Sequence, residues 1–344
     1  MTSPARRAGV VRLTELADIV NAVPHLLGFH PTESLVAVAM TGRRERLSFS
    51  MRVDLPDDGD EEQVVDVCVR AMSRARAEAV LLFVYTDAAP ADGSLPRDAF
   101  VEQLFDALPM PVRDALLVGA GRVWSYVCTD SVCCPPEGRP LVRETPGSLA
   151  LAAAHALVGQ SVLPSRDALV TSLRPLDDED GELADATDRA AEVFLAAGED
   201  GFRAGALAVL DDLLQRYADP PAAMTVDESA LVVVALHDNA FRDRVVQRCL
   251  DRSDEMRSLL GDLVRHALPP LDAPVCTALA TVAYLQGDGA VAGAALDRAF
   301  ASEPDYLLAC LLDTALRDQV SPADVRRGLS GFTPAPRRRS GRRS

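Results

Sequence analysis

The sequence contains no lysine, so all 35 basic residues among its 344 are arginine. This absence excludes Schiff-base catalysis, the phosphate-binding P-loop and the protein-kinase phosphate site, each of which needs a lysine side chain. The chain also lacks any apolar run of 18 or more residues, which disfavours a membrane-spanning helix. Its first residues lack the apolar stretch of a secretory signal. We therefore expect a cytoplasmic protein with reduced cysteines and no membrane contact.

Acidic residues outnumber basic ones. The 51 acidic residues give a formal net charge of −16, so most of the surface repels a nucleic-acid backbone. The exception is the tail at 333–344, which carries five arginines among small polar residues and is predicted to be disordered. Nucleic-acid binding is not expected apart from this tail, which can equally pair with the protein's own acidic surface.

What the sequence does contain is enough apolar material, 48% of the residues, for substantial cores. Apolar or alternating runs at 35–40, 47–53, 79–85, 115–118 and 123–127 predict strands, with helical patterns between several of them. The run at 79–85 is apolar throughout and is predicted to be a central strand covered on both faces. Together these elements predict an α/β domain at 10–175 with a mixed sheet of about five strands.

Beyond the acidic segment at 177–180, strand patterns disappear and helical patterns predict an all-α domain at 180–330. An uncharged, alanine-rich stretch before that segment predicts a buried helix at about 148–158. Residues 283–304 resemble one tetratricopeptide-like helix pair. A single such unit cannot form a solenoid, so it either contributes packing alone or forms a surface for a protein partner.

Polar, sulfur-containing and aromatic side chains gather in two segments, one that leads into the first strand and one that runs from the last strand into the loop after it. Either segment can line a pocket, but each also fits a purely structural role. His30, between a phenylalanine and a proline, is typical of a turn. Aromatic residues on one strand face are typical of core packing. Asp87 follows the buried strand, where α/β proteins tend to place ligand groups, although it is equally typical of a turn. The candidate pocket residues are His30, Ser34, Arg52, Asp54, Trp124, Tyr126, Cys128 and Glu137.

Cys128, Cys133 and Cys134 supply three soft metal ligands, and His25 or His30 can complete a tetrahedral zinc site. The spacing argues against such a site, because adjacent cysteines rarely both face one ion and the paired C-x-x-C motif is missing. The sequence therefore favours a structural loop with no metal and no cofactor, and the three-cysteine site stays as the alternative. A serine hydrolase is weakly supported because the G-x-S-x-G motif is absent.

Five segments carry a resemblance to a known family: 26–31 (LLGFHP), 52–56 (RVDLP), 124–128 (WSYVC), 133–138 (CCPPEG) and 287–290 (GDGA). They resemble an uncharacterised actinobacterial family, domain of unknown function 4192, and the resemblance spans about 13–329. It implies no activity, because the family's function is unassigned. We expect a non-enzymatic intracellular binding or regulatory protein. The alternative is a hydrolase or metal-dependent enzyme that uses His30 and the loop from Cys128 to Glu137.

Overall fold

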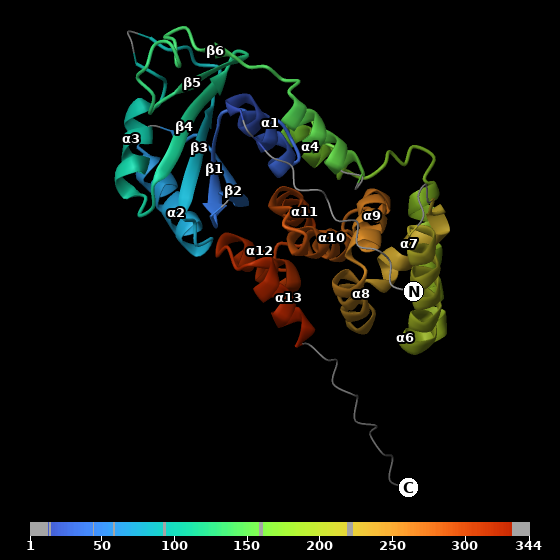
Figure 1. The fold of residues 1–344 in the computed structure, drawn as a ribbon. Coiled ribbons are helices and arrows are strands. Elements are labelled where there is room, and N and C mark those ends of the chain that lie inside the picture. Colours follow the sequence, from blue (N-terminus) through green and yellow to red (C-terminus); the bar gives the residue numbers. More distant parts are fainter. Residues whose placement is uncertain are drawn as a thin grey trace. The chain divides into compact units, whose positions relative to one another are not determined.

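The computed structural model describes residues 13, 15–43, 45–57, 59–91, 94–157, 161–218 and 223–331. The described residues divide into two compact units, one ending at Ala168 and the other beginning at Leu169. The first unit holds a sheet with helices and the second is helical (Figure 1), which confirms the predicted fold class. The arginine-rich tail lies outside the described residues. Within the ranges given above, no helix is both long enough and apolar enough to cross a membrane.

The sheet has six strands in the order β2-β1-β3-β4-β5-β6. Strands β3 and β4 are parallel and every other neighbouring pair is antiparallel, so the sheet is mixed as predicted. The sixth strand, β6, has only two residues and gave no signal in the sequence. The strands are β1 (Ser34–Thr41), β2 (Arg46–Asp54), β3 (Ala79–Tyr85), β4 (Val112–Gly119), β5 (Arg122–Ser125) and β6 (Arg139–Pro140).

Helices cover both faces of the central strands. Helices α2 (Glu61–Arg74) and α3 (Asp98–Ala107) lie on one face and α1 (Leu16–Leu27) lies on the other (Figure 1). Every residue of β3 is buried, because a strand enclosed on both sides has no wet face. The parallel strands β3 and β4 end at the same edge of the sheet, and β1 begins there because it runs antiparallel to β3. Loops that are distant in sequence therefore meet at this edge.

The helix predicted at about 148–158 is present as α4, but its predicted burial is wrong. Helix α4 spans Pro146–Leu157 and packs on α1, with Gly147 against the carboxylate of Asp18 at one end and the His155 ring 5.0 Å from the His25 ring at the other. From Leu149 to Ala156 the residues are exposed or half-buried and none is fully buried, with Leu149 at 57% exposure. An alanine-rich composition is compatible with exposure, because each methyl group adds little apolar surface.

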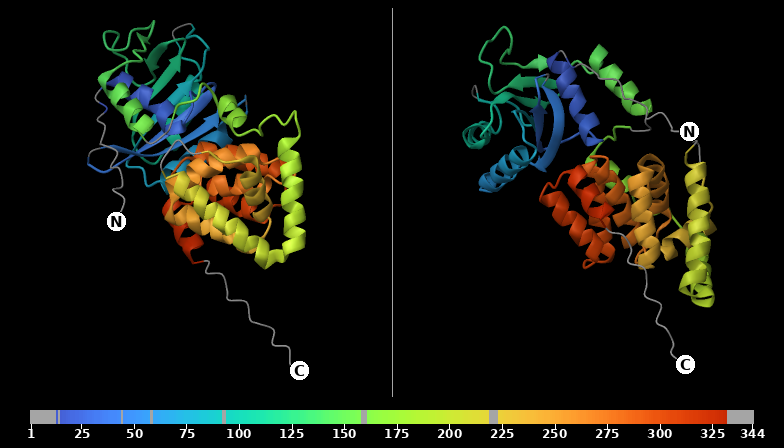
Figure 2. Two further views of the ribbon diagram at one scale, coloured as in Figure 1. Left: turned by 90° about the vertical axis from the view of Figure 1, so that its right-hand side faces the viewer. Right: turned by 60° about the horizontal axis from the view of Figure 1, so that its bottom comes forward.

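The second unit is built around α10 (Ala273–Leu285), all of whose residues are buried. This helix contains no charged residue, as its position requires. The long helix α6 (Glu182–Arg216) is interrupted at Gly198, and its two halves run in different directions in the left view of Figure 2. The tetratricopeptide-like pattern falls on α10 and α11, and its role stays a prediction. The remaining helices are α5 (Arg166–Ser172), α7 (Val226–Ala235), α8 (Asn239–Asp251), α9 (Ser253–Leu263), the 3₁₀ turn η1 (Val264–His266), α11 (Gly289–Ser302), α12 (Leu307–Arg317) and α13 (Pro322–Ser330).

Candidate functional site

A cavity of about 290 Å³ opens in the first unit, at the sheet edge where β3 and β4 end and β1 begins. Helix α1 forms one wall, and the ends of β3 and β4 supply Tyr85 and Val118. The loops before β1 and after β3 and β4 complete the lining, with residues at 30–33, 86–87 and 119–121. Ligands of open α/β sheets commonly bind at the carboxyl ends of the strands, which makes this cavity the candidate site.

The turn between β4 and β5 shapes one rim of the cavity. It contains only Ala120 and Gly121, with φ of 46° and 71°, the left-handed pair that a tight hairpin requires. The preceding residue, Gly119, has no room for a side chain, because a Cβ there would overlap the carbonyl oxygen of Thr86. The close approach of these two strand ends therefore depends on a glycine.

Glu33 ties the first rim loop to the second. Its carboxylate accepts hydrogen bonds from the Thr86 hydroxyl at 2.8 Å and from the Asp87 amide at 3.1 Å. Its own backbone has φ of 40°, a conformation that is uncommon for a residue with a side chain. Several hydrogen bonds thus hold a strained residue in place, as is frequent at ligand sites.

The segment that carries Arg143 is fixed to α1 and to the β4–β5 turn. The Asn21 side chain donates hydrogen bonds to the carbonyl oxygens of Val142 at 2.8 Å and Arg143 at 3.1 Å. The Leu141 amide donates to the Gly121 carbonyl at 2.9 Å. With its backbone held at these points, Arg143 supplies a cation to the cavity lining.

The hydroxyl group of Tyr85 is the unusual feature of the site. The residue is 8% exposed and lines the cavity, and its hydroxyl oxygen is buried with no hydrogen-bond partner among the described residues. Burial raises the pKa of this phenol, so the group is a neutral hydroxyl at physiological pH. A buried hydroxyl without a partner costs about 1–3 kcal/mol, which makes this position a potential ligand contact.

Histidine side chains surround the same end of α1. Burial lowers the pKa of His30, and the nearby Arg143 cation lowers it further. Burial also lowers the pKa of His25, followed by the charges of His155 and His30. The His25 and His155 rings lie 5.0 Å apart. Both His25 and His30 therefore favour the neutral imidazole, which leaves Arg143 as the cation of the site.

The structure brings His30 to the cavity and places three other predicted residues beside it. Ser34 is fully buried, and its hydroxyl donates to the Thr32 carbonyl at 2.5 Å and accepts from Arg52 Nε at 2.8 Å. Arg52 in turn pairs with Asp54 at 2.6 Å. Ser34, Arg52 and Asp54 thus form a polar network at the same sheet edge but do not line the cavity.

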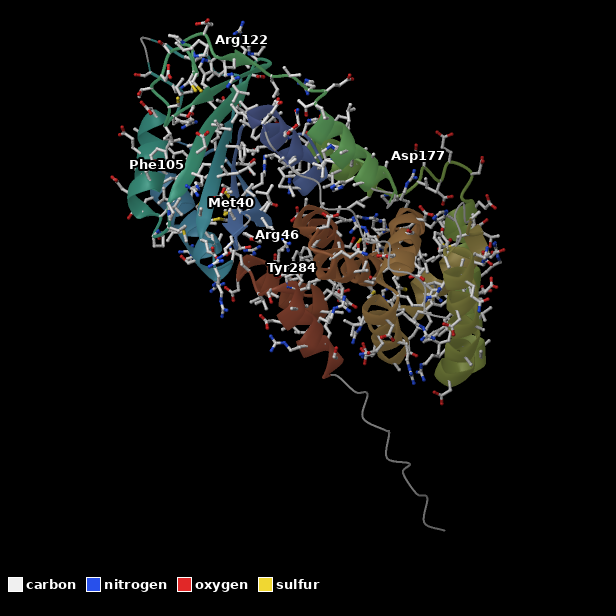
Figure 3. All side chains as sticks on the ribbon, in the orientation of Figure 1. Met40, Arg46, Phe105, Arg122, Asp177 and Tyr284 are labelled. Carbon is white, nitrogen blue, oxygen red and sulfur yellow. The ribbon has the colours of Figure 1, made fainter. Side chains whose placement is uncertain are left out.

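The other four predicted residues lie elsewhere in the unit. Trp124 and Tyr126 pack against the apolar core under α2 and α3, on the sheet face opposite α1. Cys128 follows the end of β5 that pairs with the beginning of β4, away from the cavity. Glu137 lies at the end of the loop that leads from β5 to β6. The side chain of Arg122, the first residue of β5 and labelled in Figure 3, donates a hydrogen bond to the Glu137 carbonyl oxygen at 3.0 Å. His30 and the cysteine loop therefore do not form one site.

The sequence did not identify Tyr85 or Arg143 as site residues, nor the hydrogen bonds by which Glu33 joins the two rim loops. Tyr85 was hidden in an apolar strand, where its phenol was the one polar group of the run. Arg143 lies in a loop without a motif, and no local signal marks it. Asp87, which the sequence did mark as a strand-end residue, lines the cavity.

The fold and the cavity define a two-unit protein, with a mixed α/β unit that carries a strand-end pocket and a helical unit after it. The model of the family described as domain of unknown function (DUF4192) matches residues 17–323, and the chain belongs to that family. Searches among curated proteins and among solved structures gave no match.

Proposed function

We propose that the α/β unit binds a small polar ligand in the strand-end cavity, and that the chain acts as a binding or regulatory protein. The observation that carries the proposal is Tyr85, which lines the cavity and whose buried hydroxyl has no hydrogen-bond partner among the described residues. A ligand group that hydrogen-bonds to it recovers free energy that the free protein forgoes. The cavity volume lies near the lower end of the range for ligand pockets, which favours a small metabolite over a dinucleotide.

The charges of the lining indicate the ligand's chemistry. Arg143 offers a guanidinium, which pairs well with a carboxylate or phosphate. Asp87 is exposed, also lines the cavity and offers an acceptor for a hydroxyl or amino group of the same molecule. The ligand class is therefore a small molecule with one acidic group and at least one hydrogen-bond donor.

The arrangement gives less support to the hydrolase alternative. The Ser34 hydroxyl is buried and bonded to a carbonyl oxygen and to Arg52, neither of which is a general base. A serine nucleophile needs a base within hydrogen-bond reach and access to substrate. The Cys128–Glu137 loop, which the alternative also needs, lies outside the cavity lining.

The test combines a ligand screen with variants of Tyr85 and Arg143. Thermal shift against a panel of small carboxylates, phosphate esters and their uncharged analogues should give hits among the acidic compounds. Arg143→Gln should weaken these hits at least about tenfold, since hydrogen bonds to charged groups contribute about 1.5–3 kcal/mol. Hits that bind Arg143→Gln as tightly as wild type would refute the proposed site.

Tyr85→Phe separates a ligand contact from a structural hydroxyl. It should leave the free protein as stable as wild type, or more stable by about 1 kcal/mol, while weakening binding. The control is Tyr284→Phe in the helical unit, labelled in Figure 3, whose hydroxyl lies 3.0 Å from the Ala315 carbonyl and 2.5 Å from that of Val320. This control should lose about 1 kcal/mol. An equal loss for Tyr85→Phe would remove the basis of the proposal.

A further inference from the structure

The three cysteines of the loop after β5 form a compact sulfur cluster. The Sγ atoms of Cys128, Cys133 and Cys134 all lie within 4.8 Å of one another. Cys128 and Cys134 are half-buried and Cys133 is exposed, so the cluster is open to solvent on one side. Across the described part of the chain, no other group of histidine, cysteine or acidic side chains brings three ligand atoms this close.

The adjacency argument made from the sequence does not hold in this loop. Neighbouring cysteines were expected to point apart, but the turn that contains Cys133 and Cys134 directs both sulfurs towards Cys128. The Cys134 amide donates to the Asp130 carbonyl at 2.6 Å, which closes one turn of chain around the pair. The Asp130 carboxylate accepts from the Val132 amide at 2.8 Å and fixes the start of the same turn.

The segment that carries Cys128, the third cysteine of the cluster, is held by hydrogen bonds to the end of β5 and to β4. The Ser125 hydroxyl accepts hydrogen bonds from the amides of Val127 and Cys128, at 3.1 and 3.0 Å, and donates to Asp114 at 2.9 Å. The Tyr126 amide donates to the Ala115 carbonyl at 2.8 Å, which extends the contact between the chain and β4. The cluster is therefore preorganised by hydrogen bonds on both sides, which lowers the entropic cost of collecting three ligands.

We propose that Cys128, Cys133 and Cys134 bind one zinc ion through three thiolates, with a fourth position open to solvent or to an external ligand. Three Zn–S bonds form, three thiol protons pass to solvent, and no atom changes oxidation state. Zn–S bonds of about 2.3 Å place tetrahedral sulfur ligands roughly 3.8 Å apart, so the observed cluster needs only a small contraction. A three-ligand site with an open position is the arrangement of zinc centres that bind or activate a further group.

Charge favours a divalent ion over the cuprous ion, which thiolates also bind. Three thiolates leave one net negative charge with Zn²⁺ and two with Cu⁺, and the chain already carries a formal charge of −16. Without a cation the thiolates repel one another.

Zinc binding to the full-length chain tests the assignment. The protein is reduced, treated with a chelator, exchanged into metal-free buffer and titrated with Zn²⁺ against a chromogenic competitor. We expect one zinc per chain, with loss of at least 100-fold in affinity for Cys128→Ser and for Cys133→Ser. Cys310→Ser is the matched control, because Cys310 is a half-buried free cysteine outside the cluster, and it should bind zinc as wild type does.

Three results would overturn the proposal. The first is no stoichiometric zinc in a chain whose seven thiols all react with a thiol reagent once the protein is unfolded in denaturant. The second is zinc binding that is unchanged in both cluster variants. The third is binding of Cu⁺, titrated anaerobically, without binding of Zn²⁺. Circular dichroism of the metal-free variants provides the folding check, and Cys133→Ser is the most informative variant because its side chain is exposed.

Discussion

The carbonyl oxygen of Thr86 occupies the space into which a side chain on Gly119 would have to extend. Thr86 directly follows β3, and Gly119 is the last residue of β4, which runs parallel to β3. The Thr86 amide donates a hydrogen bond to the Val118 carbonyl at 3.2 Å. The edge that carries the candidate cavity is therefore closed by a backbone contact that tolerates no Cβ.

Gly119→Ala should consequently destabilise the α/β unit by about 2 kcal/mol, because the obstacle is backbone and cannot rotate away. The matched control is Gly205→Ala in α6, where a Cβ meets nothing within 4 Å. An exposed helical glycine changed to alanine should gain about 0.5–1 kcal/mol. Urea unfolding of both variants checks the pair, and equal effects would show that the two strand ends separate at little cost.

Asp272 and Arg298 form a buried ion pair in the helical unit whose contribution to stability can be measured. Asp272 is fully buried, and its carboxylate accepts from Arg298 Nε at 2.8 Å and from the Ser302 hydroxyl at 2.5 Å. The guanidinium also donates to the carbonyl oxygens of Val264 and Ala267, at 2.8 and 2.6 Å, and to that of Leu173. One arginine thus joins α11 to the end of η1 and to the segment after α5.

Asp272→Ala should cost about 3 kcal/mol or more, since it leaves a mostly buried cation without its carboxylate. Arg317 and Asp313 provide the comparison, with the same Nε–carboxylate distance of 2.8 Å but an arginine side chain that is 78% exposed. Asp313→Ala should cost less than about 1 kcal/mol. The double variant Asp272→Ala with Arg298→Met should recover part of the loss, and a double variant that is additive would contradict the coupling.

The fold was largely predictable because its strongest signals are local. The apolar run at 79–85 became the buried strand β3, and the turn glycines after β4 formed the hairpin that their spacing indicated. The helix α4 was predicted, but its burial was not, because absence of charge does not distinguish a buried helix from an alanine-rich, partly exposed one.

The candidate site was less predictable because it depends on strand register. Glu33 and Thr86 are 53 positions apart and meet only because β1 runs antiparallel to β3. The sequence marks His30 and Asp87 as residues at loop boundaries, but it does not show that Arg143 joins them. The closeness of the three sulfurs was not predictable for a related reason: the turn at 130–134, not the spacing of the cysteines, sets the direction of their side chains.

The position of the boundary between the two units leads to a prediction about fragments. Leu169 and Leu173 are 5% and 7% exposed and belong to the second unit, and the Leu176 amide donates to the Arg265 carbonyl at 2.7 Å. A fragment of residues 164–331 retains these contacts, whereas one that begins at 180, the boundary expected from the acidic segment, loses them. The longer fragment should be more stable by about 3 kcal/mol, given about 1.5–3 kcal/mol for each buried leucine. Chemical unfolding of the two fragments measures this difference in stability. Equal unfolding midpoints would contradict the boundary at 168/169 and support the one expected at 180.

The last prediction concerns pH and the histidines at the end of α1. Burial, His155 and His30 lower the pKa of His25, and burial with Arg143 lowers that of His30. Both side chains therefore bind a proton more weakly in the folded chain than in the unfolded chain, whose pKa is about 6.5. Their contribution to stability is complete above that value and is lost as the pH falls through the lowered pKa values.

The free energy of unfolding should accordingly decrease between about pH 7.5 and pH 5, with part of the slope due to His25. Its Nδ1 atom is buried and has no hydrogen-bond partner in the part of the chain that the structure describes, so His25→Leu removes a titrating group without breaking a described hydrogen bond at that atom. The variant should show a shallower slope over this range in urea unfolding at several pH values. NMR titration of the histidine ring protons should give pKa values for His25 and His30 below 6.5 in the wild type. A variant slope as steep as that of wild type, or ring protons that titrate above 6.5, would contradict the assignment.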